Sequence, residues 1–119
     1  MREKLKKYLK VLRIELEDLE EDLQVMADIY NQREKRDEIT GYVFLENMSL
    51  LKSEIYGIER IIESLDGIVI DRYTNLEDMI EHVDQEFRNE TEDSGFPEAC
   101  YALVKRKLLK VTKYMESNE

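Results

Sequence analysis

The sequence contains few of the residues that turn or cross-link a chain. Its 119 residues include four glycines, one proline, one cysteine and no tryptophan. A strand-rich fold needs turn signals about every 8–12 residues, and so few glycines and prolines cannot supply them. We therefore expect a small number of long helices and no sheet.

The single cysteine, Cys100, excludes a disulfide within the chain and indicates a reducing compartment. No apolar run approaches the length of a membrane-spanning helix, so we expect no membrane partner. The first ten residues mix charged residues with leucines, unlike a secretory signal. The sequence therefore predicts a cytoplasmic protein.

Histidine is also scarce, which removes most catalytic arrangements. The one histidine, His82, has Asp78 four residues before it and Glu86 four residues after it. Residues at this spacing lie on one face of a helix, so we expect a surface histidine between two carboxylates. Nothing in its surroundings predicts a catalytic residue or a cofactor.

The strongest positive signal is a helical seam over about residues 3–36. Apolar residues recur there in alternating steps of three and four, the pattern of a helix packed along another helix. They are Leu5, Leu9, Leu12, Leu16, Leu19, Leu23, Met26 and Tyr30. The face is broader near its start, where Tyr8, Val11 and Ile14 join it, and near its end, where Val25 and Ile29 join it. Acidic residues surround its middle. We therefore expect the middle of this helix to meet fewer neighbours than its ends.

A second seam over about residues 42–66 predicts a helix that folds back on the first. Its members are Phe44, Met48, Leu51, Ile55, Ile58, Ile62 and Leu65. A short connection near residues 37–41 makes the two helices an antiparallel hairpin. Gly57 lies inside this helix, where it is either tolerated or required by a close helix crossing.

The last two helices are predicted to be shorter, at about residues 75–89 and 97–115. Thr74 and Glu77 have the spacing of a capping box, and Pro97 suits a first helical turn. Residues 68–70 fit either an extended connector or a last helical turn. The chain as a whole, residues 1–119, predicts a single all-α domain: an antiparallel, up-and-down bundle of about four helices, with a long hairpin over about residues 3–66.

The two short helices cannot cover the whole hairpin, which leaves part of the first seam for a partner. We expect Leu16, Leu19 and Leu23, where the seam is narrow, to form that contact. The partner is either a second copy of the chain, giving a homodimer, or another protein. The leading functional prediction is thus a non-enzymatic protein–protein interaction or assembly module with a residual coiled-coil seam.

Paired acidic residues support an enzymatic alternative. Glu63 and Asp66 form one pair with i,i+3 spacing, and Glu81 and Asp84 form another. Two such pairs on neighbouring helices can bind a magnesium–phosphate complex. The pattern resembles that of the all-α nucleotide pyrophosphohydrolases of the MazG kind, although the first pair ends in Asp rather than Glu. This resemblance implies Mg²⁺-dependent hydrolysis of nucleotides.

Basic residues at both ends of the chain support a second alternative. In an up-and-down bundle, the start of the first helix lies beside the end of the fourth, so that Lys6 and Lys10 approach Lys107 and Lys110. Such a patch could bind anions, including nucleic acid. The formal net charge of −10 opposes nucleic-acid binding. The alternative to an anion-binding site is that these lysines only keep their own helices solvated.

Overall fold

Four helices account for most of the chain, as the sequence predicts. The computed structural model describes residues 1–117, and within that range it contains no strand. The helices are α1 (Arg2–Lys35), α2 (Gly41–Ser64), α3 (Leu76–Asp93) and α4 (Glu98–Ser117), with two short 3-10 turns, η1 (Leu65–Gly67) and η2 (Ile70–Arg72). The all-α, four-helix bundle with a long first hairpin is therefore confirmed.

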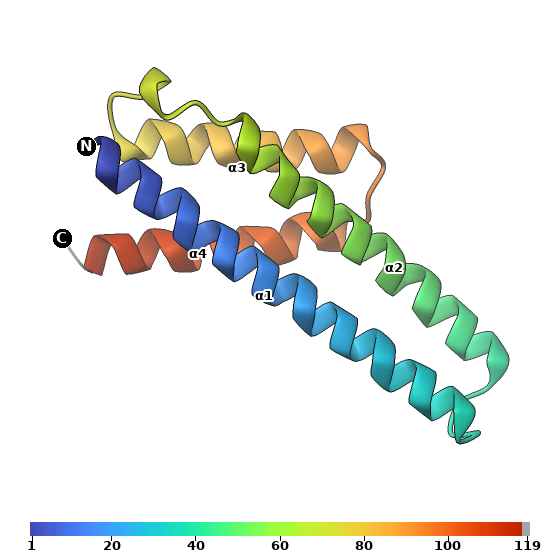
Figure 1. The fold of residues 1–119 in the computed structure, drawn as a ribbon. Helices are drawn as coiled ribbons and strands as arrows, with labels where there is room; N and C mark the ends of the chain where they lie inside the picture. The colour runs from blue at the N-terminus through green and yellow to red at the C-terminus, as the bar shows by residue number, and fades with distance from the viewer. Residues whose placement is uncertain (118–119) are drawn as a thin grey trace.

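The α1–α2 hairpin is much longer than the α3–α4 pair. The molecule measures 55 × 30 × 18 Å, and α1 runs along most of the longest dimension. Figure 1 shows α3 and α4 lying at an angle against one half of the hairpin, with the beginning of α1 and the end of α4 on the same side. The other half, which ends at the turn between α1 and α2, extends beyond them. We call residues 18–53 the arm.

α1 contributes one continuous stripe of buried residues to the core, and this stripe differs from the predicted seam at two positions. Its buried residues are Leu5, Tyr8, Leu12, Leu16, Leu19, Leu23 and Ala27. Tyr8 thus replaces Leu9, which is half-buried, and Ala27 replaces Met26, which is 44% exposed. A straight α-helix has 3.6 residues per turn rather than 3.5, so a buried face drifts around it by about 20° per heptad. The predicted seam holds a strict 3.5-residue period and therefore contains neither residue, although the sequence does place Tyr8 beside the seam on the broadened face.

Tyr8 fastens α1 to α4. Its ring is fully buried, and its hydroxyl lies 2.9 Å from Thr112 Oγ1 and 3.2 Å from the carbonyl oxygen of Leu108. Burial raises the pKa of this phenol to about 12. The bond fixes the end of α4 beside the beginning of α1, which is the pairing that an up-and-down bundle requires.

Side-chain caps define where α2 and α3 begin. Thr40 Oγ1 accepts a hydrogen bond from the backbone N–H of Val43 at 3.1 Å. At α3, Asn75 Oδ1 accepts one from the N–H of Asp78 at 2.8 Å, so the predicted capping box of Thr74 and Glu77 is wrong by one residue. Asn is as good a cap as Thr, and its extended backbone leads directly into Leu76. Residues 68 and 69 are extended and the 3-10 turn η2 follows, so neither predicted form holds over all of 68–70.

Gly57 lies at a close crossing of α2 with the start of α4. A Cβ atom at this position would lie 2.7 Å from Cys100 Sγ and 3.2 Å from Phe96 Cγ. The ring of Phe96 also packs edge-on against Tyr56, with centroids 5.5 Å apart. Of the two interpretations of this glycine, the close crossing is the one that the structure supports.

Candidate interaction surface and charged sites

The three leucines predicted to contact a partner lie inside the bundle. Leu16 has no exposed area, and Leu19 and Leu23 are 8% and 6% exposed. They are covered because α2 runs beside α1 and because α4 also packs against α1, where Lys107 bonds to Glu15. The surface that α3 and α4 leave open must therefore be formed by other side chains.

The predicted acidic pairs do not converge on one another. Asp66 pairs with Arg13 of α1, and Glu63 pairs with Arg60 at 3.3 Å. Glu81 is exposed on α3, whereas Asp84 faces α4. Among residues 1–117, no three carboxylate, thiol or imidazole groups come close enough together to hold a metal ion.

Asp84 instead joins α3 to α4 through a network of charged hydrogen bonds. Its carboxylate accepts a bond from Tyr101 Oη at 2.7 Å and one from Lys105 Nζ at 2.8 Å. Arg88 in turn donates to Tyr101 Oη at 2.9 Å and lies over its ring, 5.1 Å from the centroid. These groups satisfy one another, so the network holds two helices together.

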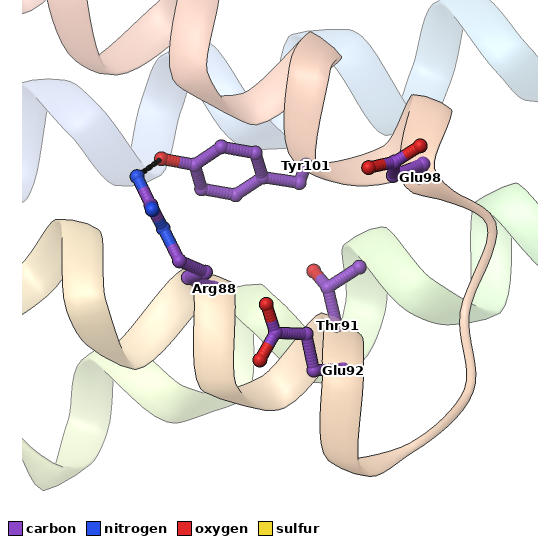
Figure 2. A pocket seen from close by; sticks show the side chains of 5 residues that line it. All are labelled: Arg88, Thr91, Glu92, Glu98 and Tyr101. Carbon is purple, nitrogen blue, oxygen red and sulfur yellow. Dashed lines mark hydrogen bonds between the residues drawn. The ribbon is translucent and has the colours of Figure 1, made fainter.

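A shallow hollow of about 210 Å³ lies beside this network. Figure 2 shows Arg88 and Tyr101 on one side of it, joined by their hydrogen bond, with Glu92, Thr91 and Glu98 around the rest. Thr91 Oγ1 is already bonded to the carbonyl oxygen of Phe87 at 2.9 Å. The hollow is therefore lined by the carboxylates of Glu92 and Glu98 and by two hydroxyls, those of Thr91 and Tyr101, that already bond to neighbouring groups.

The four lysines of the predicted anion site are divided between different partners. Lys107 and Lys110 bind the carboxylate of Glu15, at 3.1 and 3.0 Å. Lys6 approaches Glu3 at 4.0 Å, and Lys10 is exposed. The helix ends do lie together as predicted, but Lys107 and Lys110 share the single carboxylate of Glu15 on α1.

Glu15 is the ionic link between α1 and α4. The hydrogen bond from Lys110 lowers the pKa of this carboxyl, burial opposes that shift, and Lys107 adds to the lowering. The carboxylate is four-fifths covered, with a side-chain exposure of 20%. No feature of the sequence alone paired Glu15 with these lysines, because the pairing depends on where α4 lies.

Cys100 and His82, the two residues with intrinsic reactivity, both have structural partners. Cys100 is fully buried and its thiol donates to the carbonyl oxygen of Glu54 at 3.4 Å. Burial, followed by the charge of Glu54, raises the pKa of this thiol to about 11. His82 bonds to Tyr73 and lies 3.4 Å from Glu86, so only one of its two expected carboxylates pairs with it.

The arm carries the apolar surface that the bundle leaves open. On α1, Val25, Met26 and Ile29 are 55%, 44% and 48% exposed, and on α2, Val43 and Leu50 are 38% and 53% exposed. We call these five residues the arm stripe. The sequence does show that Val25 and Ile29 broaden the apolar face, but the prediction that this end of the helix has more neighbours than its middle is wrong, because α3 and α4 lie at the other end.

The arm stripe continues the face of the hairpin that α4 covers. On α1, Ile29 lies two heptads beyond Glu15, which binds α4, and residues at heptad spacing share a face. On α2, Leu50 and Val43 lie one and two heptads before Gly57, which packs against Cys100 of α4. Ile29, Leu50 and Val43 are therefore exposed on the side of the hairpin that α4 covers nearer its other end.

These features define an all-α protein, a four-helix bundle with a projecting two-helix arm. Comparisons with protein-family models, with curated proteins and with solved structures found no match. Across residues 1–117, no helix combines the length and the apolar character needed to cross a membrane.

Proposed function

We propose that this protein is a protein–protein interaction module and that the arm stripe is its contact surface. The supporting observation is that the five apolar residues of the arm stripe are each between 38% and 55% exposed, on the part of the hairpin that α3 and α4 leave uncovered. An uncovered apolar face of this kind, rimmed by charged residues, is typical of interaction sites.

The composition of α2 within the arm supports the proposal. Its first eleven residues, 41–51, include seven large apolar side chains: Tyr42, Val43, Phe44, Leu45, Met48, Leu50 and Leu51. A helix that is apolar on most sides is normally buried. Beside the arm stripe, Tyr42 and Leu45 add further exposed apolar surface to the arm, at 77% and 68% exposure.

Two isoleucines of α1 provide a matched test. Ile29 lies in the arm stripe and Ile14 lies outside the arm, yet both are 48% exposed. We expect the intact complex captured from the native cell to exceed the mass of one chain, to disappear with Ile29→Lys and to persist with Ile14→Lys. Both variants should keep the helical content and the thermal midpoint of the wild type.

Two outcomes would overturn the proposal. One is a wild-type protein recovered only at the mass of a single chain. The other is a complex that responds equally to both substitutions, since a contact through the arm cannot depend on Ile14.

A further inference from the structure

The charges along the arm are arranged so that they complement themselves. On α1, Asp18 and Asp22 precede the apolar residues Val25, Met26 and Ile29 in the sequence. Arg33 and Arg36 follow these apolar residues. Asp22, Ile29 and Arg36 follow Glu15 at heptad spacing, so they share one face of α1, and we call them the row. This face points away from the core of the hairpin and towards the side of α4, because Glu15 binds α4. One end of this row is negative and the other end is positive.

These charges are available to a partner. In the described part of the chain, residues 1–117, no Lys or Arg side chain pairs with Asp18 or Asp22. Arg33 has one contact, from its Nε to Glu38 at 3.7 Å, between side chains that are 46% and 48% exposed. An ion pair that long and exposed contributes little, and the other guanidinium donors of Arg33 remain open.

We propose that the arm binds a second copy of this chain, with the two α1 helices antiparallel about a two-fold axis beside residue 27. This inference rests on the proposed function and names its partner. The axis places Val25 of each copy opposite Ile29 of the other and Asp18 opposite Arg36. Asp22 falls opposite residue 32, one position from Arg33, within reach of a guanidinium.

The extent of the overlap agrees with the fold. Residues 18–36 span about 27 Å of helix at 1.5 Å per residue. The overlap stops short of Glu15, which is bound by Lys107 and Lys110 of α4. Two arms would then form a second four-helix arrangement, in which each copy supplies the pair of helices that the other lacks. A two-fold interface of this kind is self-complementary, as the row of charges is.

Charge reversal tests the arrangement, because a two-fold interface contains each pair twice. Wild-type protein should sediment at twice the chain mass of 14.3 kDa at micromolar concentration. Asp22→Arg alone and Arg33→Asp alone each place two like charges together, and each should raise the dimer dissociation constant by about 100-fold or more. An equimolar mixture of the two variants restores both pairs and should re-form a dimer.

The controls are reversals on the opposite side of α1. Glu17 and Lys35 are exposed and lie away from the row, so Glu17→Arg and Lys35→Asp should leave the dimer intact. The four variants alter exposed side chains and should keep wild-type helical content. A mixture that fails to dimerise, or single variants that dimerise like wild type, would overturn the antiparallel arrangement.

The two proposals fail in different ways. If the purified wild type is a monomer at 100-fold higher concentration, self-association is refuted. If Ile29→Lys nevertheless removes a partner from the complex captured in the cell, the arm remains an interaction surface for a different protein.

Discussion

Gly57 of α2 and Cys100 of α4 meet so closely that a single carbon atom would not fit between them. The Cβ of an alanine at position 57 would lie 2.7 Å from Cys100 Sγ. This contact sets how near the α3–α4 pair approaches the hairpin. It also explains a glycine in the interior of a helix, where glycine is otherwise unfavourable.

Gly57→Ala should destabilise the protein despite the better helix propensity of alanine. Overpacking costs about 1–3 kcal/mol, against about 1 kcal/mol gained in propensity, so we expect a net loss of about 1 kcal/mol in the free energy of unfolding. Urea denaturation measures this change in the free energy of unfolding. Gly41→Ala, in open space, should cause no loss, and adding Cys100→Ala to Gly57→Ala should recover part of it. A gain of stability in Gly57→Ala would refute the close crossing.

Cys100 should react slowly with thiol reagents in the folded protein. With a pKa of about 11, only about one thiol in a thousand is ionised at pH 8, whereas a cysteine at its ordinary pKa of 9.0 is about a tenth ionised. We therefore expect alkylation by iodoacetamide at pH 8 to be at least about 100-fold slower in the native state than in denaturant. It is the only thiol in the chain, so the measured rate belongs to it alone. Native and denatured rates within a factor of a few would contradict its burial.

The same thiol should make stability fall in alkali. Its folded pKa of about 11 lies above the ordinary value of 9.0, so the unfolded state loses the proton first. The stabilisation is complete below about pH 9 and is lost as the pH rises from 9 to 11, by roughly 2 kcal/mol. Urea denaturation at pH 8 and pH 10.5 measures the fall, which should be smaller in Cys100→Ala. An equal fall in both proteins would assign it to other groups, such as Tyr8.

Glu15→Gln should weaken the attachment of α4 to α1 near neutral pH. The lowered pKa means that the carboxylate stabilises the fold above its ordinary value of 4.5, and that this stabilisation is lost as the pH falls through the lowered pKa. We expect a loss of about 1 kcal/mol at pH 7, which shrinks in 1 M salt and vanishes once the pH lies below the lowered pKa of the carboxyl. Glu17→Gln, at an exposed position, is the control. A difference that persists at low pH would mean that the charge of Glu15 is not responsible.

Leu16→Ala and Leu45→Ala should separate the core from the arm surface. Leu16 has no exposed area and Leu45 is 68% exposed. Truncating the first should cost about 2–5 kcal/mol of unfolding free energy, and truncating the second less than about 0.5 kcal/mol. Thermal or urea unfolding of the two variants tests this. Similar losses in both would place the core elsewhere.

Periodicity predicted the helices well because each has a strongly apolar stripe, and local spacing is enough to reveal it. The same method failed where geometry departs from an ideal repeat. Leu9 and Met26 keep the 3.5-residue spacing, but the helix buries Tyr8 and Ala27 in their place. At α3 the side chain of Asn75 made the cap that the spacing had assigned to Thr74.

Charged sites were harder to predict, because their partners come from distant segments. Glu15 faces lysines more than 90 residues away, and Asp84 faces Tyr101 and Lys105 across a helix pair. Acidic spacing within one helix carries no information about such partners. The position of the bare surface likewise depends on where α3 and α4 lie along the hairpin, and helix lengths alone do not determine it.

The uneven cover of α1 has a consequence for its dynamics. The first half of the helix lies beside α4 as well as α2, whereas the half that ends at the turn extends beyond α3 and α4 and keeps α2 beside it. Local opening is easiest where few buried contacts must be broken, so backbone amides near Tyr30 should exchange with solvent deuterium much faster than those near Leu12. A second arm seated on the first would protect the same amides. The exchange gradient along this one helix, and its flattening as protein concentration rises, would therefore report the assembly directly.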